Sequence, residues 1–353
     1  MGDGSSHRDE TTPDEGARDH ARDPAVVGRD DPADLDSGGD DDGPFSRWVQ
    51  RTIRNPKKAY RAMFYVATIF FLLTTLFPLY WLVALALTPN ENIVDVGLLP
   101  NGFNPGAFVT VFERVPFHIY MLNSFVLAGL TTVIVLLLAS LAGYVFGRLE
   151  FPGRLPMMLG VLAISYFPPA AFLLPLFRLF TGNVQLGFFG VTVSSPTWYN
   201  TPWAMVMPFS ALFLPLSIFI LTTFYAQIPD GLEDAARIEG TSRLGALFRV
   251  IMPLSAPGVA TAGVLTFISV YNEFFFSFLM NDGRVAQTVF GVLGDTNHFA
   301  PIVQGILSYQ GQYTQSYNLM AAASVIGVIP VAIVVVIAQE RIVSGLTQGA
   351  LKE

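Results

Sequence analysis

Six long apolar stretches are the feature that most constrains how this chain can fold. They run approximately over residues 63–87, 121–147, 155–180, 203–225, 256–280 and 319–339. A helix needs ~20 apolar residues to cross a hydrocarbon core of ~30 Å, and each stretch meets that length. None shows the polar stripe at helical period that a water-soluble bundle would need. The sequence therefore predicts an all-α integral membrane protein with six transmembrane helices.

Charge is divided unevenly along the chain. Residues 1–44 carry fourteen acidic and four basic side chains, whereas the rest carries thirteen acidic and sixteen basic ones. The acidic segment has almost no large apolar side chain to offset the entropy cost of ordering, so we expect it to be disordered. Such a tail fits a halophile, and acidic tails also serve elsewhere as interaction segments. The first apolar run begins only near Met63, which argues against a signal peptide.

Four parts follow from this pattern. They are the disordered acidic tail 1–44, a basic juxtamembrane segment 45–62, a six-helix domain 63–339, and a C-terminal tail 340–353.

Basic side chains cluster on one side of the predicted spans. Six of them precede the first span: Arg47, Arg51, Arg54, Lys57, Lys58 and Arg61. Seven further basic residues fall on the same side of the membrane: Arg148, Arg154, Arg237, Arg243, Arg249, Arg341 and Lys352. The other side has only Arg114, Arg284 and Arg178, which lies at the border of a span. By the positive-inside rule, the chain is a multi-pass plasma-membrane protein with both termini in the cytoplasm.

The segment 228–257, between the fourth and fifth stretches, has the pattern of a short helix followed by a turn. Pro229 precedes a helix whose first turn contains Glu233, with Asp234 next to it, and negative charge favours the positive end of the helix dipole. Gly240 can then reverse the chain, because glycine tolerates the left-handed conformation.

A second helix is expected after this turn, capped by Thr241 or Ser242 and ended by Pro253. Its apolar residues Leu244, Leu247, Phe248 and Ile251 fall on one face at α-helical spacing. A cytoplasmic pair of helices with one apolar face suits docking of a soluble partner. The same pattern also fits an amphipathic connector that rests on lipid headgroups.

This segment resembles the cytoplasmic EAA loop of ABC importer permeases. The matching positions are Asp234, Ala235 and Ala236 for the Glu-Ala-Ala triplet, Glu239 and Gly240 for the acidic-glycine pair, and Met252 and Pro253 for the final Leu-Pro. Asp234 replaces the usual glutamate, although Glu233 beside it keeps a carboxylate at this turn of the helix.

Further runs resemble the carbohydrate-type permeases of this group. They are LNSFVLAGL from Leu122, GYVFGRLEFPGR from Gly143, SYQGQY from Ser308 and the C-terminal QERIVSGLTQGALKE. The resemblance covers roughly residues 62–353 and is closest to the smaller permease subunit of maltose systems. It implies the permease fold of type I ABC importers.

The resemblance also implies a mechanical role and a set of partners. Two ATPase subunits would bind ATP-Mg and receive the docking helices, a second permease subunit would complete a heterodimer, and an extracellular solute-binding protein would deliver a carbohydrate. This chain would bind no cofactor, metal or nucleic acid and would have no catalytic residue. The ATPase-coupling residues implied are Glu233, Asp234, Ala235, Ala236, Glu239, Gly240, Leu244, Phe248 and Pro253.

Polar residues are rare inside the predicted spans, and Glu273 is the one acid well within them. A carboxylate in the membrane is costly unless it is protonated, paired or hydrated, so it indicates a functional interior face. With Tyr271 and Asn272 it is predicted to line the substrate pathway; the alternative is a hydrogen bond between helices with no substrate contact.

Other classes of protein fit the sequence less well. An ion-coupled secondary transporter is the main alternative, but one intramembrane acid and no evident inverted repeat make a poor coupling site. A membrane enzyme lacks a candidate site, since the chain has no cysteine, four scattered histidines and no GxxxxGKS-type phosphate loop. A membrane scaffold remains open from the pattern alone.

Overall fold

The structure is a computed structural model that describes residues 56–188, 191–285, 298–311 and 315–350. The acidic tail 1–44 and most of the basic segment 45–62 lie outside the described residues, so the expectations for them remain predictions. The chain divides into two units, 1–70 and 71–353. Helix α2, Pro56–Leu87, begins in the first unit and ends in the second, and all further elements belong to the second.

Four of the described helices are long and apolar enough to cross a membrane by themselves. They cover Tyr60–Leu87, Phe117–Arg148, Trp203–Ala226 and Tyr317–Gln339, which correspond to α2, α4 (Phe117–Arg148), α7 (Trp203–Tyr225) and the first part of α15 (Tyr317–Ala350). These helices agree with the first, second, fourth and sixth predicted spans. The number of spans rises to six if each of two bent helix pairs is one span: Arg154–Ser165 with Ala170–Phe180, and Arg243–Leu254 with Ala256–Tyr271.

The third and fifth predicted spans are interrupted. The third consists of α5 (Arg154–Ser165) and α6 (Ala170–Phe180), which meet at an angle of 84°. Pro168 and Pro169 lie at this bend, where a proline lacks the N–H and disfavours helix in the residue before it. The fifth consists of α11 (Ala256–Tyr271) and α12 (Phe275–Leu279), with a break at 272–274.

Short elements connect the long ones. Helices η1 (Asn90–Asp95) and α3 (Ala107–Arg114) lie between α2 and α4, and α14 (Ile302–Leu307) lies between α12 and α15. An antiparallel hairpin of β1 (Gln185–Phe188) and β2 (Val191–Ser194) pairs Gln185 with Ser194 and Phe188 with Val191. The all-α prediction missed this hairpin, because two strands of four residues give too short an alternating pattern to be recognised.

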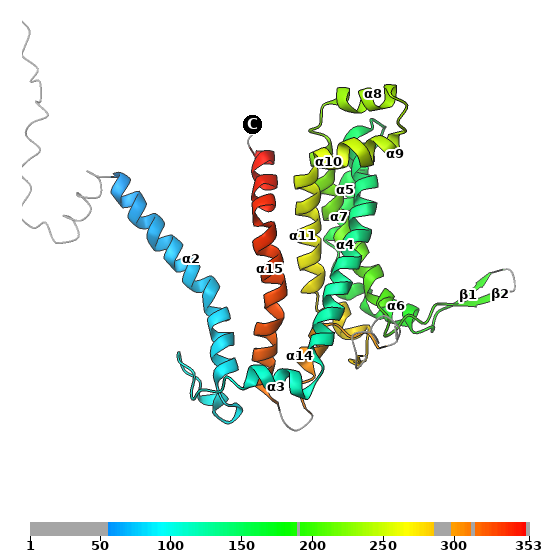
Figure 1. The fold of residues 1–353 in the computed structure, drawn as a ribbon. Coiled ribbons are helices and arrows are strands. Elements are labelled where there is room, and N and C mark those ends of the chain that lie inside the picture. The colour runs from blue at the N-terminus through cyan, green and yellow to red at the C-terminus, as the bar shows by residue number, and fades with distance from the viewer. Residues whose placement is uncertain (1–55, 189–190, 286–297, 312–314, 351–353) are drawn as a thin grey trace, which may run out of the picture. The chain divides into compact units, whose positions relative to one another are not determined.

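Helices α4 and α7 form the centre of the second unit and lie along each other, with α11 packed against both and against α15 (Figure 1). Two glycines of α4 permit this contact. A Cβ at Gly143 would lie 3.0 Å from the Cβ of Leu221, and one at Gly147 would lie 3.0 Å from the backbone oxygen of Thr222. Small residues at such positions let membrane helices approach backbone to backbone.

The outer faces of the bundle are apolar. Ile329, Ile333, Val336 and Ile337 of α15 are all exposed, and so are Leu155, Met157 and Leu159 of α5. A monomeric soluble protein does not leave faces of this kind open to water. Lipid or neighbouring subunits therefore cover them, in agreement with the predicted membrane location.

Hydrogen bonds connect the described residues of the loop before α15 to the N-terminal half of α4 and to α3. Asn123 Nδ2 donates to the Ala300 oxygen over 2.9 Å, and Ser124 Oγ accepts from the Ile302 N–H over 2.7 Å. Tyr309 donates to the Val111 oxygen over 2.6 Å, and burial raises the pKa of its hydroxyl, which keeps it protonated as a donor. The described part of this loop is thus a folded cap.

We predict that the α4–α7 contact tolerates no added side chain. Substituting Gly147→Ala or Gly143→Ala should lower the free energy of unfolding by about 1–3 kcal/mol, because the opposing atoms are largely backbone. The measurement is the unfolding transition of the purified protein in detergent. Gly129→Ala is the matched control in the same helix, since a Cβ there meets nothing within 4 Å. An equal effect at Gly129 would contradict the prediction.

Candidate functional site

Residues 228–257 fold at the end of the bundle where α4 finishes (Figure 1). Their first helix, α8, covers Asp230–Ile238 and follows Pro229, which has the extended conformation of a residue before a helix. The first turn contains Asp230 and Glu233, so negative charge lies near the positive end of the helix dipole. This start agrees with the sequence prediction.

Gly240 reverses the chain after α8, with a φ of +90°. Its N–H donates to the Arg237 oxygen and the Thr241 N–H donates to the Ala236 oxygen, each over 3.0 Å. This pair of bonds is the Schellman arrangement, which requires a left-handed residue. Nothing lies within 4 Å of a Cβ built at Gly240, so the requirement for glycine comes from the backbone and not from crowding. The predicted reversal is confirmed.

The second helical segment comprises α9 (Arg243–Ala246), the π-helical turn η2 (Leu247–Ile251) and α10 (Met252–Leu254). Ser242 caps it, because its Oγ accepts from the Gly245 N–H over 3.1 Å. The segment ends at Ser255 and meets α11 at 85°. The prediction that Pro253 ends the helix was wrong: Pro253 lies inside α10.

The apolar residues of this segment do not share one face, contrary to the prediction. Leu247 and Ile251 are fully buried against Tyr144 and Tyr225, whereas Leu244 and Phe248 are exposed at 58% and 43%. A π-helical turn advances the side chains by a smaller angle per residue than an α-helix, so residues predicted to align are turned apart. Leu247 and Ile251 therefore anchor the segment on the bundle, and Leu244 and Phe248 remain exposed.

Arg148, the last residue of α4, holds α8 against the bundle. Its Nε lies 3.0 Å from Glu233 Oε2, and its Nη1 lies 2.9 Å from Asp230 Oδ1 and 2.6 Å from the Ile228 oxygen. Tyr144, one helical turn earlier, donates to Glu233 Oε1 over 2.5 Å. The side chains of Arg148 and Glu233 are only 5% and 10% exposed, so this is a buried, hydrogen-bonded ion pair.

Glu233 and Asp234 are adjacent but point in different directions. Glu233 forms the buried ion pair with Arg148. The side chain of Asp234 is 65% exposed, and its Oδ1 lies 3.8 Å from Nη1 of Arg237 in a loose surface pair. Glu233 therefore cannot replace Asp234 in an outward contact, although the sequence allowed this reading. An external partner of α8 would meet Asp234.

The outward surface of the loop is formed by exposed residues of both helical segments. It contains Asp234, Ala235, Ile238, Glu239, Leu244 and Phe248, and we call it the outward face. Ala236 is half-buried, and Pro253, within α10, is exposed. The outward face combines apolar side chains with two carboxylates, a composition suited to a protein partner.

Sequence reasoning missed Tyr144 and Arg148 as site residues, although the GYVFGR run contains a signal for them. Tyr144 and Arg148 are at positions i and i+4 of a helix, so they lie on one face. Arg148 is at the C-terminal end of this helix, where the helix dipole favours a cation. What the sequence could not supply is their partner, because Glu233 is 85 residues away from Arg148.

The predicted pathway residues lie around the break between α11 and α12. Tyr271 is buried and donates to the Gly327 oxygen of α15 over 3.0 Å, while exposed Asn272 donates back to the Ile268 oxygen. Glu273 accepts from the N–H groups of Phe275, Phe276 and Ser277, at 2.9, 3.0 and 3.2 Å. Its carboxylate thus caps the start of α12 and satisfies backbone donors that the break leaves free.

Comparisons with known proteins identify the family of this chain. The model of the family described as binding-protein-dependent transport system inner membrane component matches residues 137–348. The sulfoquinovosyl glycerol transport system permease protein SmoH of Agrobacterium fabrum is 33% identical to this chain over 82% of it and 93% of the relative. The trehalose/maltose transport system permease protein MalG of Thermococcus litoralis is also 33% identical, over 83% of this chain and 97% of the relative.

Among solved structures, one chain of a bacterial alginate ABC transporter, in complex with an alginate pentasaccharide-bound periplasmic protein, has a similar fold. The TM-score is 0.58 at 16% identity, and the match covers 83% of this chain and 96% of the other. At this identity the likeness concerns the fold alone.

We predict that Arg148 is required for stability because it neutralises the buried carboxylate of Glu233. Arg148→Met should lower the free energy of unfolding by about 3–5 kcal/mol, since Glu233 would remain buried without its partner. Measurement of the unfolding transition in detergent tests this. The double variant Arg148→Met with Glu233→Leu should regain most of the loss, because no orphaned charge remains. Arg237→Gln, in the exposed pair with Asp234, is the control and should change stability by about 0–1 kcal/mol.

Proposed function

Because this chain belongs to the family of binding-protein-dependent transport system inner membrane components, we propose that it is one of two permease subunits of an ATP-driven carbohydrate importer. The chain is a membrane-embedded transport subunit and not an enzyme. In the proposal, ATP-Mg is bound and hydrolysed by two partner ATPase subunits, and an extracellular solute-binding protein delivers the cargo.

The observation that carries the proposal is the construction of the 228–257 loop. Its inner side is anchored by the buried pair of Arg148 and Glu233, and its outward face has no partner among the described residues. We propose that this outward face docks in a cleft of an ATPase subunit. Asp234, Leu244 and Phe248 contact the ATPase, while Gly240 fixes the angle between α8 and α9.

In the proposed mechanism Glu233 contacts α4, whereas its neighbour Asp234 contacts the ATPase. Movement of the ATPase displaces α8, and the ion pair with Arg148 passes this displacement to α4 without a flexible connection. Because a buried charge pair is costly to separate, α8 and the end of α4 move together. Ala235 and Glu239 belong to the docking outward face, and we propose that Ala236 and Pro253 support it.

The carbohydrate class rests on the relatives. Their names contain sulfoquinovosyl glycerol, trehalose and maltose, and each covers more than three quarters of this chain. The sequence runs that resemble carbohydrate-type permeases support the same class. The sugar itself can be identified from the cognate binding protein, as the ligand that raises its melting temperature.

We further propose that the break at 272–274 faces the translocation pathway. Asn272 is exposed there and can contact a passing hydroxyl group. Tyr271 and Glu273 build the break, through the bond to α15 and the cap of α12, so their effect on transport is through geometry. The orientation with both termini in the cytoplasm follows from the positive-inside rule and puts the 228–257 loop on the ATPase side.

The docking proposal predicts a specific crosslink. The chain has no native cysteine, so Leu244→Cys can be paired with single cysteines in the ATPase of the complete transporter. We expect crosslinking at Leu244 and none at Val109→Cys, which is equally exposed but lies in α3, away from the 228–257 loop. Absence of any crosslink at Leu244 in an active transporter, or access to it from outside the cell, would contradict the proposal.

The angle set by Gly240 gives a second prediction. Gly240→Val should reduce uptake and transport-coupled ATP hydrolysis at least about tenfold, because a β-branched residue strongly disfavours a φ of +90°. Gly240→Asn should retain much of both activities, since asparagine tolerates the left-handed region. Gly231→Ala, inside α8 with free space at its Cβ, is the control. Uptake that continues without ATP and follows a sodium or proton gradient would instead support a secondary transporter.

A further inference from the structure

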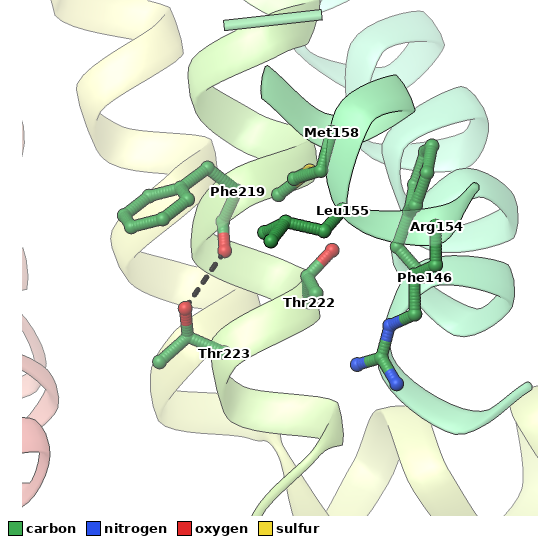
Figure 2. Close-up of a pocket in the computed structure, with 7 residues that line it drawn as sticks. All are labelled: Phe146, Arg154, Leu155, Met158, Phe219, Thr222 and Thr223. Atoms are coloured by element: carbon green, nitrogen blue, oxygen red, sulfur yellow. Dashed lines mark hydrogen bonds between the residues drawn. The ribbon is translucent and has the colours of Figure 1, made fainter. Parts of the chain in front are cut away.

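A pocket of about 420 Å³ lies between α4, α5 and α7, outside the docking and pathway sites. Figure 2 shows the side chains around it, with Leu155 and Met158 of α5 facing Phe219 of α7. Phe146 of α4 completes the apolar lining. Phe146 and Arg148 are two residues apart, so the pocket lies at the same end of the bundle as the 228–257 loop.

Two polar residues of the lining have side chains without a hydrogen-bond partner in the described part of the chain. Arg154, the first residue of α5, makes no ion pair or side-chain hydrogen bond within the part of the chain that the structure describes. The hydroxyl oxygen of Thr222 is buried and has no hydrogen-bond partner there either. Its neighbour Thr223 bonds instead to the Phe219 oxygen of its own helix over 3.0 Å. A buried hydroxyl without a partner costs free energy, so a ligand atom that bonds to it would be stabilising.

The chemistry of the lining selects an anion. Arg154 carries a full positive charge that no carboxylate of the lining neutralises. The first turn of α5 contains no acidic residue, and its positive dipole end adds to the same field. A zwitterionic headgroup would bring an ammonium group with no partner in this lining, whereas a headgroup with net negative charge would not.

The walls of the pocket select a lipid over a free anion. Leu155 and Phe219 are exposed at 69% and 46%, and exposed Met157 and Leu159 continue this apolar surface along α5. An acyl chain can lie on that surface while its phosphate reaches Arg154. An inorganic anion would gain nothing from it.

We propose that this pocket is a binding site for an anionic phospholipid of the membrane leaflet on the 228–257 side, with Arg154 and the Thr222 hydroxyl contacting its phosphate. Arginine suits this task because its guanidinium can donate two parallel hydrogen bonds to phosphate oxygens. The bound lipid fills the space between α5 and the α4–α7 pair, directly beside the end of α4 that carries Arg148.

The test is a lipid titration of the purified complete transporter in detergent, with bound lipid counted by native mass spectrometry. Phosphatidylglycerol should bind wild-type protein more tightly than phosphatidylcholine with the same acyl chains. Arg154→Gln should weaken phosphatidylglycerol binding about fivefold, and Thr222→Val about threefold. Thr222→Val conserves shape, so it tests the site even if the arginine variant folds poorly.

Two matched controls accompany these variants. Arg178→Gln removes the same charge from the last turn of α6, and Thr132→Val removes another buried hydroxyl without a partner, in α4. Neither should change phosphatidylglycerol binding. The proposal is overturned if Arg154→Gln and Thr222→Val bind this lipid as wild type does, or if phosphatidylcholine binds equally well. It is also overturned if Arg178→Gln is equally impaired, or if millimolar inorganic phosphate displaces the lipid, which would indicate a free-anion site.

Discussion

A buried arginine at the end of α4 determines how the 228–257 loop is attached. Arg148 has almost no contact with solvent, and a cation in that position needs acceptors, which α8 and the residue Ile228 before it supply. Tyr144 donates to the other carboxylate oxygen of Glu233. The pair therefore does more than hold two elements together: it fixes which side of α8 faces the bundle. Asp234 and Ile238 are left outside as a consequence.

The hydrophobic pattern and the local chemistry of single residues were sufficient to predict much of this fold. Four spans, the reversal at Gly240 and a cap at Thr241 or Ser242 depend on interactions within a few residues, which a sequence displays directly, and the structure shows the cap at Ser242. Family resemblance was equally accessible from short runs and agrees with the matched family model. The breaks at Pro168 and at Asn272 were not predicted, because the apolar stretch resumes after the two prolines and after the polar pair Asn272 and Glu273.

The features that escaped prediction depend on distant partners or on an altered helical geometry. The role of Glu233 follows from Arg148, and no local pattern connects the two. Within the π-helical turn at 247–251, Phe248 is exposed and Ile251 is buried, although their spacing is that of one α-helical face. Glu273 is similar: an acid in an apolar run indicates function, but only the structure reveals that three backbone N–H groups occupy it.

Helix α4 is continuous over 32 residues, which corresponds to a length of about 48 Å. One of its ends is tied to the cap through Asn123 and Ser124, and the other is tied to α8 through Arg148. A helix of this kind transmits tilt with little loss, because its own hydrogen bonds resist bending. A push on α8 at one end of this helix would therefore also shift the cap at its other end.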